Sequence, residues 1–126
     1  MTENELSGII IGAAIEVHRE LGPGLLERVY EVCLAHELKK HGLRVQSQVD
    51  MQVNYKEIEL DTGFKADLLI NEKLIIEVKS VKELNDIHLA QLLTYLKLSD
   101  LRLGLLINFN TRRVRDGIKR VVNGYI

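Results

Sequence analysis

The sequence contains a single cysteine, Cys33, one proline and no tryptophan among its 126 residues. One cysteine excludes a disulfide framework and a cysteine-rich zinc site, and four histidines without paired spacing give little support to a histidine-based zinc site. The longest uncharged apolar run, from Ile9 to Ile15, is far shorter than the ~20 residues that cross a bilayer. No basic region precedes this run as in a secretory signal. We therefore expect a cytoplasmic protein that has no membrane partner.

The chain also lacks an excess of charge of either sign, with 17 basic and 18 acidic residues. A globally basic nucleic-acid-binding protein has a different composition. The basic residues are nevertheless concentrated near the C-terminal end, where a short segment contains Arg112, Arg113, Arg115, Lys119 and Arg120 against Asp116 alone. Such a segment can contact a phosphate backbone, and the alternative is that it forms a solvated helix face.

The length is that of one compact domain, and we expect a single domain over residues 1–126. Apolar spacing of 3.6 residues predicts helices, and alternation of apolar and polar residues predicts strands. The expected helices cover 2–21, 25–41 and 86–98, followed by a final helix with Val114, Ile118, Val121 and Val122. The expected strands cover 45–53 with a short continuation at 58–60, then 63–70, 74–80 and 103–109. The order α-α-β-β-β-α-β-α predicts an α/β (α+β) fold with a mixed sheet flanked by helices.

Two of these strands form a hairpin whose register follows from its loop. If residues 71–73 form the loop, Ile70 pairs with Leu74, Asp67 faces Glu77, and Lys65 faces Lys79. The predicted apolar face then consists of Ala66, Leu68, Ile70, Leu74, Ile76 and Val78. A slip of one residue would mix polar and apolar side chains on both faces, so the pattern supports this register.

In this register two carboxylates, Asp67 and Glu77, lie directly opposite each other. Like charges about 4 Å apart repel by on the order of 4 kcal/mol at an effective dielectric constant near 20. A divalent cation removes this repulsion because hard oxygen ligands bind Mg²⁺, and the carbonyl of Val78 is a further candidate ligand. Lys79 lies about 6.6 Å further along the strand on the same face, where its ammonium can reach a phosphate. The alternative is a lattice of charge pairs on an exposed sheet face.

These residues resemble those of a known group of proteins. The segments Phe64-Lys65-Ala66-Asp67 and Ile76-Glu77-Val78-Lys79 are similar to the motif of the PD-(D/E)XK nuclease superfamily. Residues 24–30, Gly-Leu-Leu-Glu-Arg-Val-Tyr, resemble the motif of the small GxxExxY protein family. Gln91 and Tyr95 match the Q-x3-Y helix motif of the RecB-like branch. The resemblance implies a restriction-endonuclease-like three-layer core. The chain departs from the superfamily motif at Ala66, where the superfamily name has proline.

The resemblance also implies roles for individual residues. Asp67 and Glu77 would be ligands of Mg²⁺ or Mn²⁺, Lys79 the catalytic lysine, and Glu27 a further acid that faces the site. Supporting positions are then Gln91, Tyr95, Tyr30 and His88. Purely structural roles remain open for these additions: a favourable acid in the first turn of a helix for Glu27, core-edge positions for both tyrosines, backbone bridging for Gln91, and a structural or supporting role for His88.

Two functions follow from the sequence. The first is a metal-dependent nuclease that hydrolyses phosphodiester bonds in DNA, with RNA as the less favoured alternative substrate, and that contacts phosphates through the basic segment 112–120. The second is a catalytically silent module that keeps the nuclease fold and acts as a nucleic-acid or protein-binding adaptor. A core of this size has little surface for choosing a target, so we expect a homodimer or a larger complex.

Overall fold

The structure, a computed structural model, describes residues 1–126, without the side chains of Asp61 and Thr62. Its elements follow one another in the order α1 (Glu3–Leu21), α2 (Glu27–Lys40), β1 (Val45–Tyr55), β2 (Ile58–Ile70), β3 (Leu74–Lys79), α3 (Asp86–Ser99), β4 (Leu103–Asn108), a 3-10 helix η1 (Val114–Gly117) and β5 (Ile118–Val122). Within the described chain, no helix is long and apolar enough to span a bilayer.

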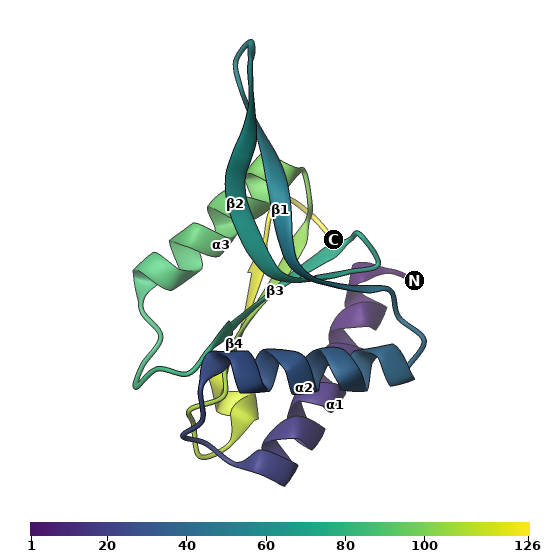
Figure 1. The fold of residues 1–126 in the computed structure, drawn as a ribbon, viewed down its shortest axis with the longest axis vertical. Coiled ribbons are helices and arrows are strands. Elements are labelled where there is room, and N and C mark those ends of the chain that lie inside the picture. The colour runs from purple at the N-terminus through teal and green to yellow at the C-terminus, as the bar shows by residue number, and fades with distance from the viewer.

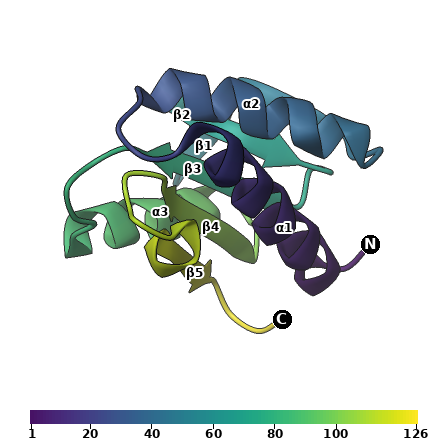
Figure 2. The same cartoon turned by 90° about the horizontal axis from the view of Figure 1, so that it is seen from below.

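The strands form one mixed sheet in the order β1-β2-β3-β4-β5. Only β3 and β4 run parallel, and the other neighbours are antiparallel. Helices α1 and α2 cover one face of the sheet and α3 covers the other, as the two views in Figures 1 and 2 show. This arrangement confirms the expected three-layer, restriction-endonuclease-like architecture.

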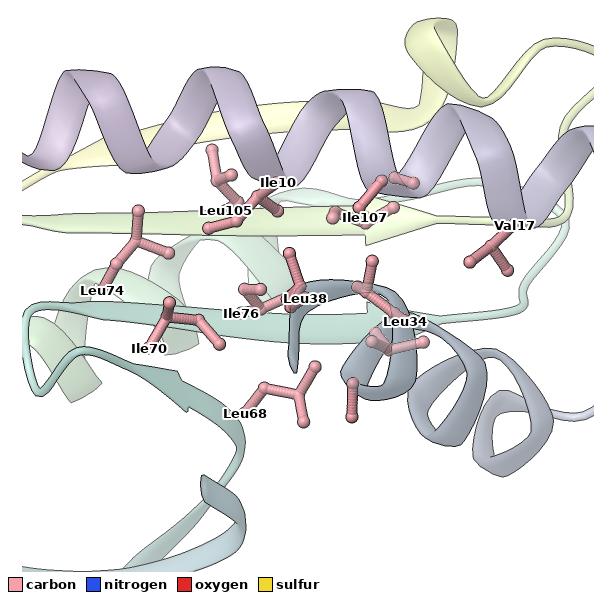
Figure 3. Packing of buried hydrophobic residues seen from close by; sticks show 14 of the residues in the cluster. Ile10, Val17, Leu34, Leu38, Leu68, Ile70, Leu74, Ile76, Leu105 and Ile107 are labelled. Carbon is pink, nitrogen blue, oxygen red and sulfur yellow. The ribbon is translucent and has the colours of Figure 1, made fainter. Parts of the chain in front are cut away.

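The larger part of the core lies between the sheet and the pair α1 and α2. Side chains from both helices meet the apolar face of the central strands (Figure 3), and the cluster includes Ile10, Val17, Leu34, Leu38, Leu68, Ile70, Leu74, Ile76, Leu105 and Ile107. A smaller cluster on the opposite face packs Leu92 and Leu96 of α3 against Leu69, Ile75 and Leu106. Because strands β3 and β4 are covered on both faces, most of their residues are apolar and do not alternate with polar ones.

Local signals in the sequence set the ends of the helices. The side chain of Thr2 accepts a hydrogen bond from the Glu5 amide, and Glu5 reciprocates at the Thr2 amide, so the predicted capping box starts α1. Helix α3 begins one residue earlier than predicted, since its N-cap is Asn85 and not Asp86. Two apolar residues whose helical spacing predicts that they share the apolar side of their helices are exposed instead, Leu21 by 37% and Leu26 by 76%.

The hairpin of β2 and β3 has the predicted register at its loop end. Ile70 pairs with Leu74 and Leu68 with Ile76, but the ladder of paired residues ends there. Lys65 therefore does not face Lys79; it pairs with Asp50 of β1, and its ammonium lies 3.0 Å from the Asp50 carboxylate. Beyond this point β1 and β2 continue as a long two-stranded arm that projects from the layers (Figure 1).

The predicted apolar face is wrong at one position, Ala66. This residue is buried in the smaller cluster, beneath α3, whereas Leu68 and Ile70 belong to the larger cluster. The alternation of β2 is broken between them. The residue of β1 in register with Asp67 is Gln48, which has a positive φ of 51°. Because this left-handed conformation interrupts the pleat of β1, the paired strands turn together and exchange faces at this point.

The predicted final helix is also wrong. Only residues 114–117 are helical, as one 3-10 turn, and residues 118–122 form β5 along the free edge of β4. A Cβ at Gly117 would lie 2.3 Å from the Asn108 carbonyl oxygen, so the chain turns too tightly there for a longer helix. Pairing with β4 satisfies backbone groups that would otherwise stay open, and this segment is rich in Val and Ile, which favour strands.

Candidate active site

Two carboxylates meet where the strands β2 and β3 stop pairing. The Asp67 amide donates a hydrogen bond of 2.8 Å to Glu77 Oε2, and the Val78 amide donates one of 2.8 Å to Asp67 Oδ2. Each carboxylate thus accepts from an amide of the opposite strand, in place of the backbone ladder that ended at Leu68 and Ile76. The crossed pair fixes both side chains at the point where the two strands separate.

The end of β3 supplies two more polar groups to this point. In an extended strand the N–H and C=O of one residue point to the same side, so the Val78 carbonyl faces the same gap as the amide bound to Asp67. The next carbonyl, that of Lys79, accepts a hydrogen bond of 2.9 Å from the Phe109 amide on the other side. Backbone pairing with β4 therefore anchors Lys79, the residue whose ammonium acts on both carboxylates.

The segment from Gly22 to Tyr30 brings α2 to the same end of the sheet. Tyr30 is fully buried, and its hydroxyl donates to the Gly22 carbonyl at 2.5 Å and accepts from the Leu25 amide at 3.1 Å. Gly24 has a φ of 98°, which side chains of L-residues rarely adopt. This clamped turn starts α2 so that Glu27 Oε2 accepts a hydrogen bond of 3.1 Å from the Ser80 amide, just beyond Lys79.

Tyr30 therefore acts on the site through the backbone turn, and its ring stacks on Phe109 with centroids 4.5 Å apart. Ser80 adds a second link, because its hydroxyl donates to the Leu25 carbonyl at 2.6 Å. These contacts explain the spacing of the motif in residues 24–30. Gly24 permits the turn, Tyr30 closes it, and Glu27 between them reaches the end of β3.

Two residues that the sequence analysis missed lie beside Asp67. Glu31 of α2 is only 4% exposed, and its carboxylate accepts hydrogen bonds from Arg28 and from Gln48 of β1. The Gln48 amide Nε2 lies 2.6 Å from Glu31 Oε1 and 3.3 Å from Asp67 Oδ1. The sequence does contain a signal for Glu31: it lies one helical turn after Glu27, and so on the same side of α2, and it directly follows the core residue Tyr30. Nothing in the local pattern distinguishes Gln48 from the other glutamines of β1.

Burial and mutual repulsion make the ionised carboxylates unfavourable. Burial raises the pKa of Glu77 to about 7, and the charge of Asp67 adds to this rise, while the Asp67 amide and Lys79 oppose it. Burial also raises the pKa of Asp67, against the Val78 amide and the charge of Lys79. The pKa of Glu31 is raised chiefly by burial, with a further contribution from Asp67. The site thus has an excess of negative charge that Lys79 and the amides only partly neutralise.

Helix α3 contributes an aromatic side to the site. The Tyr95 ring stacks on Phe64 of β2 with centroids 3.9 Å apart and planes 8° apart. Burial raises the pKa of the Tyr95 hydroxyl, the charges of Glu77 and Asp67 add to this, and a hydrogen bond with Gln91 opposes it. Tyr95 and Gln91 therefore lie together and within electrostatic reach of the carboxylates. His88 instead accepts a hydrogen bond from the Asn85 amide through its ring and donates one from its own amide to the Asn85 side chain, so it completes the N-terminal cap that Asn85 forms on α3.

The basic residues of the C-terminal segment do not share one face. Arg113 and Arg115 line a hollow beside His18 and Arg19 of α1, and Arg115 and Arg120 line a second hollow along α1. Lys119 lines a different hollow with Lys82 and Leu84, the residues that precede α3. Arg112 is exposed in the loop after β4. Since β3 and β4 are parallel, this loop leaves the sheet at the same end as Lys79.

The donor set at the strand ends suits a hard divalent cation. Asp67, Glu77 and the Val78 carbonyl supply only oxygen ligands, and Mg²⁺ is commonly bound by one or two carboxylates plus waters and substrate phosphates. Among the residues whose side chains are described, no three His, Cys, Asp or Glu groups already stand together as a complete metal cage. The residues therefore fit an ion that keeps several water or substrate ligands.

A sequence model of the PD-(D/E)XK nuclease superfamily matches residues 4–121, which is nearly the whole chain. The chain matches no curated protein and no solved structure. The match confirms the superfamily that the Asp67, Glu77 and Lys79 spacing indicated. The GxxExxY family and the RecB-like branch stay predictions, as do the single domain and the cytoplasmic location.

Proposed function

The chain belongs to the PD-(D/E)XK nuclease superfamily, and we propose that it is a metal-dependent nuclease that hydrolyses phosphodiester bonds in DNA. The observation that carries this proposal is the crossed arrangement of Asp67 and Glu77 beside Lys79. Two carboxylates with raised pKa values lie at one strand end, bound to fixed amides, with an amine in electrostatic contact. Superfamily members generally use divalent metal ions, and the excess negative charge here favours one.

The residues of the site divide the work as follows. Asp67, Glu77 and the Val78 carbonyl hold Mg²⁺ or Mn²⁺, and Glu27 is a further acid at the same sheet end. When bound, the ion polarises the phosphoryl oxygen and lowers the pKa of its water. The ammonium of Lys79 stabilises the negative charge that develops on the phosphate. Gln91 and Tyr95 support the site from α3.

We further propose that phosphates on either side of the scissile bond contact the basic residues that follow β4. Arg112 and Arg113 are exposed in the loop at the same sheet end as Lys79, and Arg115 follows in η1. Lys119 and Arg120 lie further along β5 and line opposite sides of the molecule. The residues nearest the loop are therefore expected to contribute most to DNA affinity and to its salt dependence. A homodimer would double this basic surface.

Cleavage of labelled single- and double-stranded DNA tests the proposal. We expect products with Mg²⁺ or Mn²⁺, none with a chelator, and none with Asp67→Ala. Lys79→Ala should retain Mn²⁺ binding and slow cleavage by roughly 10²–10³-fold, the usual effect of removing one stabilising group. Lys97→Ala, a substitution of an exposed lysine in the last turn of α3, is the matched control. Intact DNA under every condition, or activity that survives Asp67→Ala, would refute the proposal.

The adaptor remains a second candidate because the basic residues that would contact DNA do not share one face. It predicts DNA or protein binding without turnover, and binding that tolerates Lys79→Ala. Calorimetry with Mn²⁺ separates the two candidates. Binding that is lost in Glu77→Ala supports the nuclease, whereas the absence of any Mn²⁺ binding supports the adaptor.

A further inference from the structure

We propose that Gln48 is a positioning residue, which ties the metal-binding carboxylate Asp67 to the buried carboxylate of Glu31. This inference rests on the proposed function and adds two residues to that site. Gln48 Nε2 lies 2.6 Å from Glu31 Oε1 and 3.3 Å from Asp67 Oδ1. Because an amide nitrogen has two hydrogens, one side chain can serve both carboxylates.

The backbone of β1 is shaped to present this amide. Gln48 is in register with Asp67, between the pairs Ser47–Leu68 and Val49–Ala66. Its φ of 51° is one that L-residues other than Asn, Asp and His seldom adopt. The strands exchange faces at this pair, and the Gln48 side chain reaches both Asp67 beside it and Glu31 of α2.

Glu31 is suited to be an anchor rather than a ligand. It is 4% exposed, and its second carboxylate oxygen is bound by Arg28 of the same helix. Both of its oxygens thus already accept hydrogen bonds from cationic or amide groups, and its position on α2 is fixed by the core residues Tyr30 and Leu34 around it. A buried acceptor held in this way gives Gln48 a fixed point to bind.

The consequence concerns the orientation of Asp67. One of its oxygens accepts from the Val78 amide and the other from Gln48, so two donors on different strands fix the plane of the carboxylate. Groups that orient a metal ligand typically change metal affinity by 10–100-fold when they are removed. Gln48 and Glu31 should act in the same way on Asp67, without contacting the ion.

Four variants test the inference in the full-length protein. Gln48→Leu removes the tether, and Gln52→Leu is the matched control, because Gln52 also lies on β1 and binds a carboxylate, that of Glu59. Glu31→Ala removes the anchor. Glu31→Gln keeps an oxygen that accepts from Gln48 but removes the charge that a metal ligand would need.

Two readouts are used: Mn²⁺ affinity by calorimetry, and hydrogen exchange of the Val78 amide without metal, with urea unfolding as a check of the fold. We expect Gln48→Leu and Glu31→Ala to weaken Mn²⁺ binding at least 10-fold and to speed Val78 exchange about as much. Glu31→Gln should stay within about threefold of the wild type in both readouts, and Gln52→Leu should not differ from it.

Two results would overturn the inference. The first is unchanged Val78 exchange and Mn²⁺ affinity in Gln48→Leu. The second is a loss in Glu31→Gln equal to that in Glu31→Ala, which would make Glu31 a metal ligand. If the proposed nuclease function is wrong, the wild type itself binds no Mn²⁺. In that case hydrogen exchange of the Val78 amide in the metal-free variants still decides whether Gln48 positions Asp67.

Discussion

The buried charge of Glu77 gives the metal-free protein a pH-dependent stability that one substitution removes. In the folded protein burial and Asp67 raise the pKa of Glu77 from its ordinary value of 4.5 to about 7. Between these values the folded state holds the proton that the unfolded state has already released. Stability therefore falls as pH rises through this window, and is lowest above pH 7.

The magnitude follows from the size of the shift. Such a rise corresponds to a loss of about 3 kcal/mol once Glu77 is ionised in both states, and most of this loss falls between pH 5 and pH 8. Glu77 is 6% exposed, so solvent screens little of the effect. Glu77→Gln is neutral at every pH and retains an oxygen that accepts from the Asp67 amide.

Urea unfolding in the presence of a chelator at pH 5 and pH 8 measures the difference. We expect Glu77→Gln to gain roughly 2–3 kcal/mol over the wild type as pH rises from 5 to 8, on the order of 10 °C in melting temperature for a chain of this size. Glu83→Gln, at an exposed glutamate after β3, should run parallel to the wild type. If the curves of Glu77→Gln and the wild type were parallel between pH 5 and pH 8, the assigned burial of charge would be refuted.

Three further predictions concern the metal, the α2 turn and the α3 interface. At pH 8, Mn²⁺ at 100 times its dissociation constant should stabilise the wild type by about 2.7 kcal/mol, and thermal unfolding should show no such gain in Asp67→Ala. Tyr30→Phe removes two hydrogen bonds of a buried hydroxyl; we expect a loss of about 1–3 kcal/mol in urea unfolding and faster hydrogen exchange of the Ser80 amide that binds Glu27. Gly104→Ala places a Cβ 2.9 Å from the Leu92 side chain and should destabilise by about 1–3 kcal/mol. Adding Leu92→Ala should make the effect of Gly104→Ala much smaller in a double-mutant cycle.

Most of the layer structure could be predicted because the apolar pattern matches one local structure in each segment. Thr2 and Glu5 specify the start of α1 by themselves, and the polar loop 71–73 between two apolar runs specifies the β2–β3 register. The C-terminal segment was different. Val114, Ile118, Val121 and Val122 fit a helix face, but the tight turn at Gly117 and the open edge of β4 favoured a strand. Both of those factors are tertiary, so the local pattern does not contain them.

The residues of the candidate site that belong to a local sequence pattern could be predicted, whereas those brought to it by tertiary contacts could not. Asp67, Glu77 and Lys79 follow from strand register, and Glu27 from its motif. The face exchange at Gln48 depends on one residue with positive φ, and glutamine is not a type that indicates this conformation. For the same reason Gln48 and Glu31 were missed, and Ala66 was assigned to the wrong face. The C-terminal basic residues were expected on one helix. Because residues 118–122 form a strand instead, Lys119 and Arg115 line different hollows.

The separation of β2 and β3 explains how the fold itself holds two carboxylates close together. Where the ladder stops, the amides of Asp67 and Val78 lose their backbone partners, and unpaired buried amides are unfavourable. The two carboxylates accept from them, and hydrogen bonds to an ionised acceptor are stronger than those between neutral groups. The carboxylates thus satisfy the amides at the strand ends, and the amides stabilise the carboxylates. Some repulsion remains, because the charge of Asp67 adds to the rise that burial causes in the pKa of Glu77. Because the amides already fix both side chains, a cation that binds there gains attraction without first ordering its ligands, and this is the condition under which a small two-carboxylate site can bind a divalent ion.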